Sequence, residues 1–285
     1  MSRLEELVEE YVAERQATGH MADITAGTVR GNLVRMARHM SCAPEEVTLA
    51  KAMGWLREAG GKPSTVAQRV KQSKRFFAWL VDNDHLVKNP LAKLEAPRVP
   101  TGEPKFLERN PVGELLAVCK APKDRALVLC AVQMGMRRVE LHRALVEDVD
   151  WDLMLIAVRG KHHAGEISRR LPIPDQAAQA LKEWMILRPT AGPYLFGTRH
   201  GTPMMTGEIS KKIADLMRKA GVKKRSGDGM GTHALRHTFA QHLVDDGVEI
   251  RVVQAALGHS TVQTTEIYLR RRVEGLREAM EGRQY

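Results

Sequence analysis

The sequence has few cysteines and no long hydrophobic run, and both shortages exclude classes of protein. Its 285 residues contain three cysteines, Cys42, Cys119 and Cys130, without the Cys-x-x-Cys spacing of zinc and redox motifs. We expect them to be reduced thiols in the core. No segment approaches the roughly 18 to 20 apolar residues that span a bilayer, and the N-terminus lacks the apolar stretch of a signal peptide. A soluble, cytoplasmic protein without a membrane partner is therefore expected.

Positive charge is what the sequence has in excess. Lysine and arginine outnumber aspartate and glutamate by 44 to 34, which gives a formal net charge of +10. This excess is expected of a protein that binds the phosphate backbone of nucleic acids. Many basic proteins bind no nucleic acid, so the positions of the basic residues are more informative than their number.

The first part of the chain has the periodicity of amphipathic helices. Helices are expected over residues 3–15 and again from about residue 25, and the most regular one begins near residue 62, where Ser64 or Thr65 can cap it. Its apolar stripe consists of Val66, Val70, Phe77 and Leu80. Its other side carries Gln68, Arg69, Lys71, Gln72 and Arg75. That side is either a solvated surface or a surface laid against DNA phosphates, in which case Arg69, Lys71 and Arg75 contact DNA.

A linker rich in proline divides the chain. Residues 95–104 hold three prolines and a glycine, residues that break helices and strands. We therefore expect a helical N-terminal domain over residues 1–95, a linker over 96–104 and a larger domain over 105–285.

The larger domain is expected to be mostly helical with a small antiparallel β-sheet. Helical patterns cover residues 111–119, 123–147, 174–187 and 206–220, and three more helices are expected at 233–245, 249–257 and 261–270. Between them, residues 153–159 and 167–173 have the pattern of two strands joined by a glycine-bounded turn that carries Lys161. A loop with Lys223, Lys224 and Arg225 precedes the last helices and is a candidate phosphate contact, although a merely solvated loop fits as well. The chain is predicted to be mainly α.

Three distant segments carry residues suited to phosphate chemistry. The first is the run from Gly135 to Leu141 with Arg137, the second is His233-Ala-Leu-Arg236, and the third is Leu257-Gly258-His259, followed nine residues later by Tyr268. In the second segment the spacing of three places an imidazole and a guanidinium on one face of a helix. Gly258 is expected to end one helix, and Ser260 with Gln263 has the spacing that begins the next.

These segments resemble the signature motifs of the tyrosine recombinase, or phage integrase, family. The motifs match in type, order and spacing, and they fall on Arg137, Lys161, His233, Arg236, His259 and Tyr268. Residues 64–94 are similar to the last long helix of that family's N-terminal core-binding domain and its Asn-Pro exit, so the resemblance covers nearly the whole chain. The chain departs from the usual pattern at Met134, at the Arg138-Val139 pair after Arg137, and at the doubled histidine that follows Lys161.

The resemblance implies a mechanism for these residues. Tyr268 would attack a DNA phosphate and form a 3′-phosphotyrosine, with the two arginines stabilising charge on the phosphate oxygens. His233 would accept the tyrosine proton, His259 would hydrogen-bond the transition state, and Lys161 would protonate the departing 5′ oxygen. Glu140 would orient the basic residues. The covalent bond conserves energy, so neither ATP nor a metal cofactor is expected.

The resemblance also implies partners: double-stranded DNA target sites, three further copies of the chain in a tetramer on two duplexes, and an accessory DNA-bending or directionality protein. The amphipathic segment after Tyr268 packs either on its own domain or on a neighbouring subunit.

Other interpretations are weaker but remain open. The spacing of His233 and His237 on one helix would suit a metal, but Arg236 would place a positive charge beside it. A type IB topoisomerase and a non-catalytic DNA-binding regulator are the rival functions.

Overall fold

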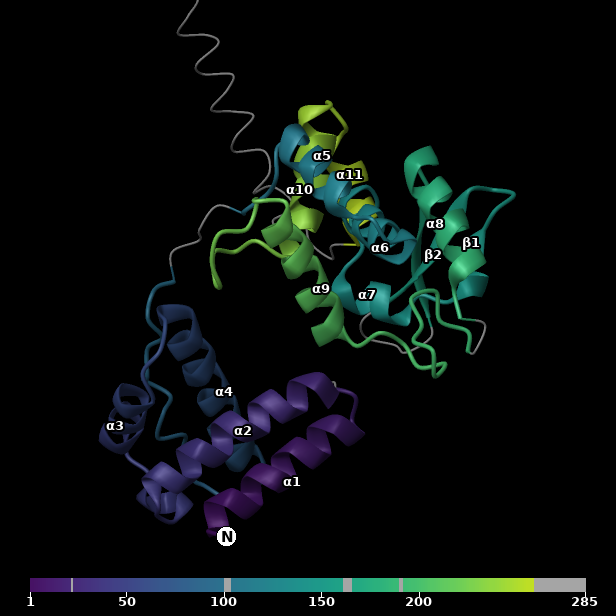
Figure 1. The fold of residues 1–285 in the computed structure, drawn as a ribbon. Helices are drawn as coiled ribbons and strands as arrows, with labels where there is room; N and C mark the ends of the chain where they lie inside the picture. Colours follow the sequence, from purple (N-terminus) through teal and green to yellow (C-terminus); the bar gives the residue numbers. More distant parts are fainter. Residues whose placement is uncertain (22, 100–103, 161–165, 190–191, 259–285) are drawn as a thin grey trace, which may run out of the picture. The chain divides into compact units, whose positions relative to one another are not determined.

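The computed structural model describes residues 1–21, 23–99, 104–160, 166–189 and 192–258, and divides into two compact units, Met1–Gly102 and Glu103–Tyr285 (Figure 1). The division lies within the segment predicted as a linker. Helices dominate both units and the sheet is small, so the predicted mainly α fold is confirmed. Among the described residues, no helix is long and apolar enough to cross a membrane.

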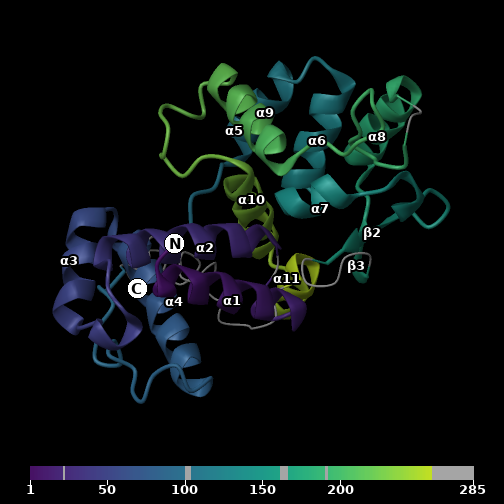
Figure 2. The same cartoon turned by 90° about the horizontal axis from the view of Figure 1, so that it is seen from below.

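The first unit is a helical bundle around an aromatic core. It comprises α1 (Arg3–Ala17), α2 (Asp23–Met40), α3 (Leu49–Ala59) and α4 (Pro63–Asp82), and α1 lies alongside α2 (Figures 1 and 2). The Tyr11 ring of α1 packs edge-on against Phe76 and Trp79 of α4, with ring centroids 5.5 and 5.4 Å apart. The helices predicted at residues 3–15 and from about residue 25 are confirmed, whereas α3 was not predicted.

Helix α4 differs from its prediction at its start and on one face. It begins at Pro63, so Ser64 and Thr65 lie inside the first turn, and neither caps it. Proline is favoured at this first position because its missing N–H would have had no partner there. Gln72 was predicted on the solvent or DNA side but is buried, and its side-chain oxygen accepts a hydrogen bond of 2.8 Å from Asn32 Nδ2.

The second unit packs its helices around α6. Its helices are α5 (Arg109–Val118), α6 (Pro122–Val132), α7 (Arg138–Arg143), α8 (Asp175–Leu187), α9 (Thr206–Lys219), α10 (Thr232–Asp245) and α11 (Ile250–Leu257). Every residue of α6 from 126 to 132 is buried, and α8 and α10 pack on it. Cys119 and Cys130 are buried free thiols in this unit, as expected, while Cys42 in the first unit is half-buried and also free.

A three-stranded antiparallel sheet lies beside these helices. The strands β1 (Val149–Asp150), β2 (Leu155–Arg159) and β3 (Ile167–Pro172) pair in that order, with Ile156 opposite Leu171. The two predicted strands are confirmed, and β1 is an addition. Lys161 at the turn between β2 and β3 lies outside the described residues, as do the helix predicted at 261–270 and the segment after it.

The helical pattern predicted over residues 123–147 is interrupted, and this interruption shapes the site. The chain leaves α6 at Val132 and begins α7 at Arg138, and Gly135 between them has a φ of +60°. A Cβ at this position would lie 2.4 Å from the Phe239 ring of α10. Only glycine tolerates both the left-handed backbone and this close approach. The helical pattern over residues 123–147 therefore corresponds to two helices, α6 and α7, separated by a turn at Gly135.

Candidate active site

Glu140 is the acidic centre of a cluster of arginines in the second unit. Its side chain is 4% exposed, and its Oε2 accepts a hydrogen bond of 2.7 Å from the backbone N–H of Arg137. Arg137 Nη1 donates to Glu140 Oε1 at 2.8 Å. The two residues lie three apart at the start of α7, so the first turn of the helix brings both groups of Arg137 to one carboxylate. Glu140 was predicted to orient the basic residues, and it contacts Arg137 within one turn; its role in orienting them stays a prediction.

Arg169 on β3 joins the same carboxylate, and it is not among the site residues predicted from the sequence. Its Nη1 and Nη2 each donate to one Glu140 oxygen, both at 2.9 Å, in the bidentate geometry that suits a guanidinium and a carboxylate. Its Nε donates to the backbone carbonyl of Ala256 in α11 at 2.7 Å. The alternation of the strand held a signal, because Arg169 has the same parity as the buried Leu171 and Ile173.

Three arginines from three elements donate to three successive carbonyls at the end of α11. Arg169 of β3 binds the carbonyl of Ala256, Arg236 of α10 binds that of Leu257, and Arg137 binds that of Gly258 at 3.2 Å. The last carbonyls of a helix lack partners within the helix and carry partial negative charge, so they attract cations. The structure thus brings together the three motif segments: those that contain Arg137, Arg236 and Gly258.

Exposure distinguishes the three arginines. The side chain of Arg137 is 29% exposed, against 9% for Arg169 and 6% for Arg236. Arg236 also donates to the carbonyl of Gly135 and lies 3.9 Å from Glu140 Oε2. Of the three, Arg137 is therefore the one with a side chain open to a ligand in this structure.

His233 lies at the start of α10, one turn before Arg236. Its partial burial, followed by the charges of Arg138, Arg236 and Arg137, lowers the pKa of its imidazole below the ordinary value. One turn further on, burial and the neighbouring His233 and Arg236 lower the pKa of His237 to about 4. A histidine with a lowered pKa is neutral near pH 7 and can accept a proton. Among the described residues, no three side chains of the metal-binding types form a group that could hold a metal ion.

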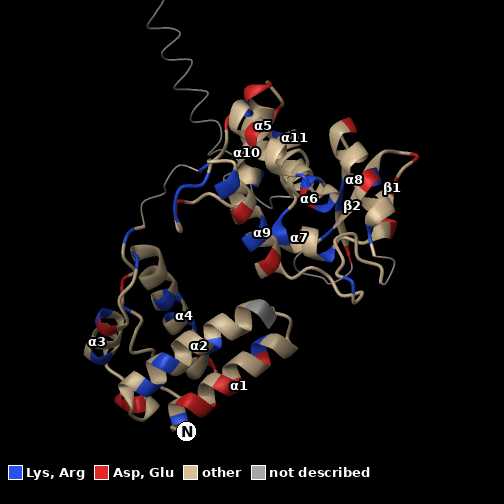
Figure 3. Ribbon diagram, in the orientation of Figure 1, with Lys and Arg blue, Asp and Glu red and all other residues tan. Residues whose placement is uncertain are grey.

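A basic loop precedes α10, and Asp228 organises it. Asp228 accepts hydrogen bonds from the backbone N–H groups of Lys224 and Arg225 at 3.0 and 3.1 Å, and pairs with the Lys223 ammonium at 2.5 Å. The ammonium of Lys223 lowers the pKa of Asp228, which stays charged. Lys224 and Arg225 are exposed at the loop, where Lys and Arg gather (Figure 3). Lys223 is largely buried, and its contact with DNA stays a prediction.

The basic residues predicted on α4 have different environments. Lys71 and Arg75 are exposed. Arg69 is half-buried and donates through Nη1 to the carbonyls of Ala59 and Gly60, which closes the end of α3. Contacts of all three residues with DNA stay predictions.

Three predicted site residues, Lys161, His259 and Tyr268, lie outside the described residues. The chain on the near side of Lys161 is held in place, because Gly160 donates to the carbonyl of Glu166 at 2.9 Å and accepts from Arg143 Nη1 at 2.6 Å. Gly258, just before His259, has the left-handed conformation that was predicted to end a helix, with a φ of +61°.

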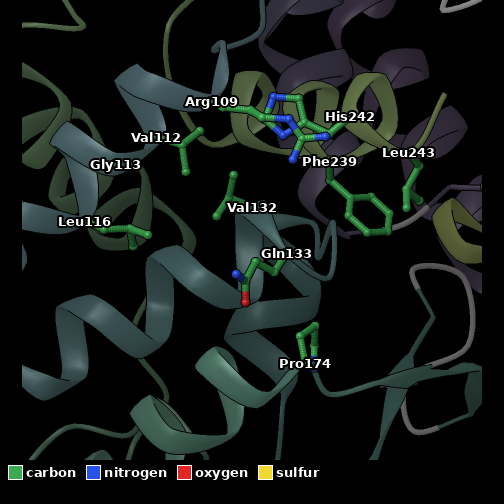
Figure 4. A pocket seen from close by; sticks show the side chains of 10 residues that line it. All are labelled: Arg109, Val112, Gly113, Leu116, Val132, Gln133, Pro174, Phe239, His242 and Leu243. Atoms are coloured by element: carbon green, nitrogen blue, oxygen red, sulfur yellow. The ribbon is translucent and has the colours of Figure 1, made fainter. Parts of the chain in front are cut away.

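A pocket of about 440 Å³ between α5, α6 and α10 contains none of the three arginines. Arg109 and His242 lie at one end of it and Pro174 at the other, with Val132 and other apolar side chains between them (Figure 4). Its lining is mostly apolar, and it lies apart from the cluster around Glu140.

Comparisons with known proteins show the family of the chain and the likeness of its fold. A model described as the phage integrase family matches residues 105–274. The chain is 32% identical to the tyrosine recombinase XerC of Corynebacterium efficiens, over 88% of this chain and 84% of that protein. It is 30% identical to the XerC of Erythrobacter litoralis, over 94% and 88%. Its fold is similar to that of a lambda integrase in a crystal structure of a dimer bound to a COC′ core site, with a TM-score of 0.76, 17% identity, and coverage of 99% of this chain and 79% of that one.

Proposed function

Since the chain belongs to the phage integrase family and is a tyrosine site-specific recombinase, we propose that Tyr268 is its nucleophile and that Arg137, His233 and Arg236 act on the phosphate it attacks. The observation that carries this proposal is the convergence of the three motif segments on the end of α11, directly before His259. A phosphodiester bound there would meet an exposed guanidinium and a neutral imidazole.

Each residue has a distinct part in the proposed reaction. The Tyr268 oxygen bonds to phosphorus, the bond to the 5′ oxygen breaks, and the tyrosine proton passes to His233. Lys161 gives its proton to the departing 5′ oxygen, and His259 hydrogen-bonds a phosphate oxygen. Arg137 stabilises charge on the non-bridging oxygens, which is the main protein contribution to phosphoryl transfer. Arg236 takes part once the phosphate displaces a carbonyl from its guanidinium. Rejoining reverses these steps with a 5′ hydroxyl from the other duplex.

We propose that double-stranded DNA binds to both units. The first unit would contribute Lys71 and Arg75 of α4, and the second would contribute the exposed Lys224 and Arg225. Phosphate contacts of this kind position a protein on DNA without reading the base sequence. Similarity to a lambda integrase dimer on a core site supports a DNA partner.

The finer assembly is also proposed. Exchange between two duplexes requires one nucleophile for each of four strands, so a homotetramer on two target sites is the expected assembly. An accessory DNA-bending or directionality protein would set the outcome. The reaction would take place in the cytoplasm, on nucleoid or phage DNA, because its substrate lies there.

Recombination of a plasmid tests the proposed function. A binding site is first selected from a random duplex library with the full chain, and two copies are placed on one supercoiled plasmid. We expect products with the intervening DNA excised or inverted, detected by restriction mapping. Relaxed plasmid with no recombinant product would favour a topoisomerase, and unchanged plasmid would favour a DNA-binding regulator.

The pH dependence of cleavage tests His233. Only the neutral imidazole accepts the tyrosine proton, and the neutral fraction rises with pH through the pKa. Because the site lowers this pKa, we expect the cleavage rate to hold as the pH falls to about 6.5, the ordinary value, and to decline only below it. Single-turnover rates from about pH 5 to about pH 8 measure this. His233→Gln should lose the pH dependence together with most of the rate; a decline that survives this change would assign it to another group.

A further inference from the structure

We propose that Arg169 is a positioning residue of the reaction, which holds Arg137 and the last turn of α11 in one fixed arrangement through Glu140. It lies on β3, a strand that carries none of the proposed site residues. The inference rests on the proposed role of Arg137 as the phosphate clamp.

The contacts of Arg169 connect three elements. Two of its nitrogens bind the two oxygens of Glu140 on α7, and the third binds the Ala256 carbonyl on α11. One rigid, planar group therefore sets the spacing between α7 and α11. Lysine, with one flexible ammonium, cannot make these three bonds with the same geometry.

Gly258 allows the close contact between Arg169 and the end of α11. A Cβ at Gly258 would lie 3.0 Å from Arg169 Nη1 and 3.4 Å from its Cδ, so the guanidinium packs against the bare backbone. The carbonyl of the same residue accepts the hydrogen bond from Arg137 Nη2. The positions of Arg137 and Arg169 are thus coupled at the residue from which the chain leaves α11.

Burial indicates that Arg169 acts through its neighbours. Its side chain is 9% exposed, and each of its three nitrogens donates to a protein oxygen. Arg137, at 29%, bonds to the same carboxylate and is open to solvent. Arg169 therefore contacts Glu140 from the buried side, whereas Arg137 is the residue proposed to contact the phosphate.

Arg169 also keeps Glu140 charged. Glu140 faces Arg137, which precedes its own helix, Arg169 on β3 and Arg236 on α10. Burial by itself would raise the pKa of this carboxyl, but the hydrogen bonds and charge of Arg169, followed by the Arg137 N–H and the charge of Arg236, lower it overall. Without Arg169, less positive charge offsets the effect of burial on the carboxyl, so the pKa of Glu140 rises. A protonated Glu140 would hold Arg137 less firmly.

Two substitutions at Arg169 separate positioning from folding. Cleavage is followed as covalent adduct formed in a single turnover on a nicked duplex from which rejoining is blocked, and DNA binding and thermal unfolding are measured on the same proteins. We expect Arg169→Lys to bind DNA within about threefold of the parent and to form adduct about 10²-fold more slowly, the cost of a small misplacement. Arg169→Gln should be slower still.

The pH profile supplies a readout that general destabilisation does not move. With its charge removed, Arg169→Gln should lose cleavage more steeply than the parent as the pH falls, because protonation of Glu140, whose pKa is raised, adds to protonation of His233. Arg169→Lys keeps the charge, so its decline should stay near that of the parent. His233 is present in all three proteins, and its pKa shift comes from burial and from Arg138, Arg236 and Arg137.

Arg170→Gln is the matched control. Arg170 is the next residue on β3, is exposed, and lies on the opposite face of the strand. It should cleave within about threefold of the parent. Equal cleavage by the parent and both Arg169 variants would overturn the inference alone. A parent protein that forms no adduct on the selected duplex would overturn the proposed function, and the role of Arg169 with it.

Discussion

Replacing Tyr268 by phenylalanine should abolish the covalent adduct with DNA. The change removes one oxygen, the atom proposed to bond to phosphorus, and no other group can supply that bond. We expect adduct formation to fall by about 10⁴-fold or more, as in other enzymes that lose their nucleophile. Binding to the selected duplex should change little, because the ring is retained. The measurement is a denaturing gel of protein mixed with the nicked duplex described above.

Tyr194→Phe serves as the matched control for this experiment. It removes the same atom from a tyrosine in the second unit, whose backbone pairs with Leu145. Its adduct yield should equal that of the parent. If the adduct persists in Tyr268→Phe and disappears in another tyrosine variant, that other tyrosine is the nucleophile. If no tyrosine variant loses the adduct, covalent tyrosine chemistry itself is excluded.

Arg137→Lys should have the second-largest effect. Lysine retains the charge, but its three N–H donors radiate from one nitrogen, so they cannot reach Glu140, Gly258 and a phosphate oxygen as the planar fork of arginine does. Arginines that stabilise phosphoryl transfer contribute about 10³-fold or more to the rate, and we expect a loss of that order in single-turnover cleavage. The thermal unfolding midpoint should fall only slightly, because the side chain is partly exposed.

The same experiment on Arg138 decides the register of the motif. Arg138 follows Arg137 directly and is exposed at the start of α7, so it is the competing candidate for the clamp. Its own substitution by lysine should slow cleavage by less than about threefold, the range of surface substitutions. If Arg138→Lys is the more damaging change, the clamp lies one residue further along than proposed.

Local patterns in the sequence predicted most of the elements in the second unit. The strands at 153–159 and 167–173 and the helices at 174–187, 206–220, 233–245 and 249–257 are present within a few residues. Helices and strands are recognisable because their periods repeat over neighbouring residues. For the same reason, the pairing of Arg137 with Glu140 and the end of α11 at Gly258 could be expected, since each depends on residues within one turn.

Other features depended on residues far apart in the chain. The turn that divides the helical pattern at 123–147 leaves no room for a Cβ at Gly135, because Phe239, about a hundred positions away in the sequence, packs against it. Gln72 is buried, and Asn32, forty positions away in the sequence, donates a hydrogen bond to its side chain. Contacts between residues so far apart do not appear as a repeating pattern in the local sequence, so neither contact could be expected from the sequence around it.

By itself, the sequence determined which chemical groups this protein has and the local spacing at which it holds them: two arginines, a lysine, two histidines and a tyrosine in motifs typical of a tyrosine recombinase. Tertiary structure alone decided that Arg137, Arg169 and Arg236 meet at three successive carbonyls of α11, and that Arg137 is the exposed one of the three. The physical reason is range. Hydrogen bonds within a turn join residues that are close in the sequence. The partners of a buried carboxylate can lie on elements that are distant in the sequence and that meet only when the core packs.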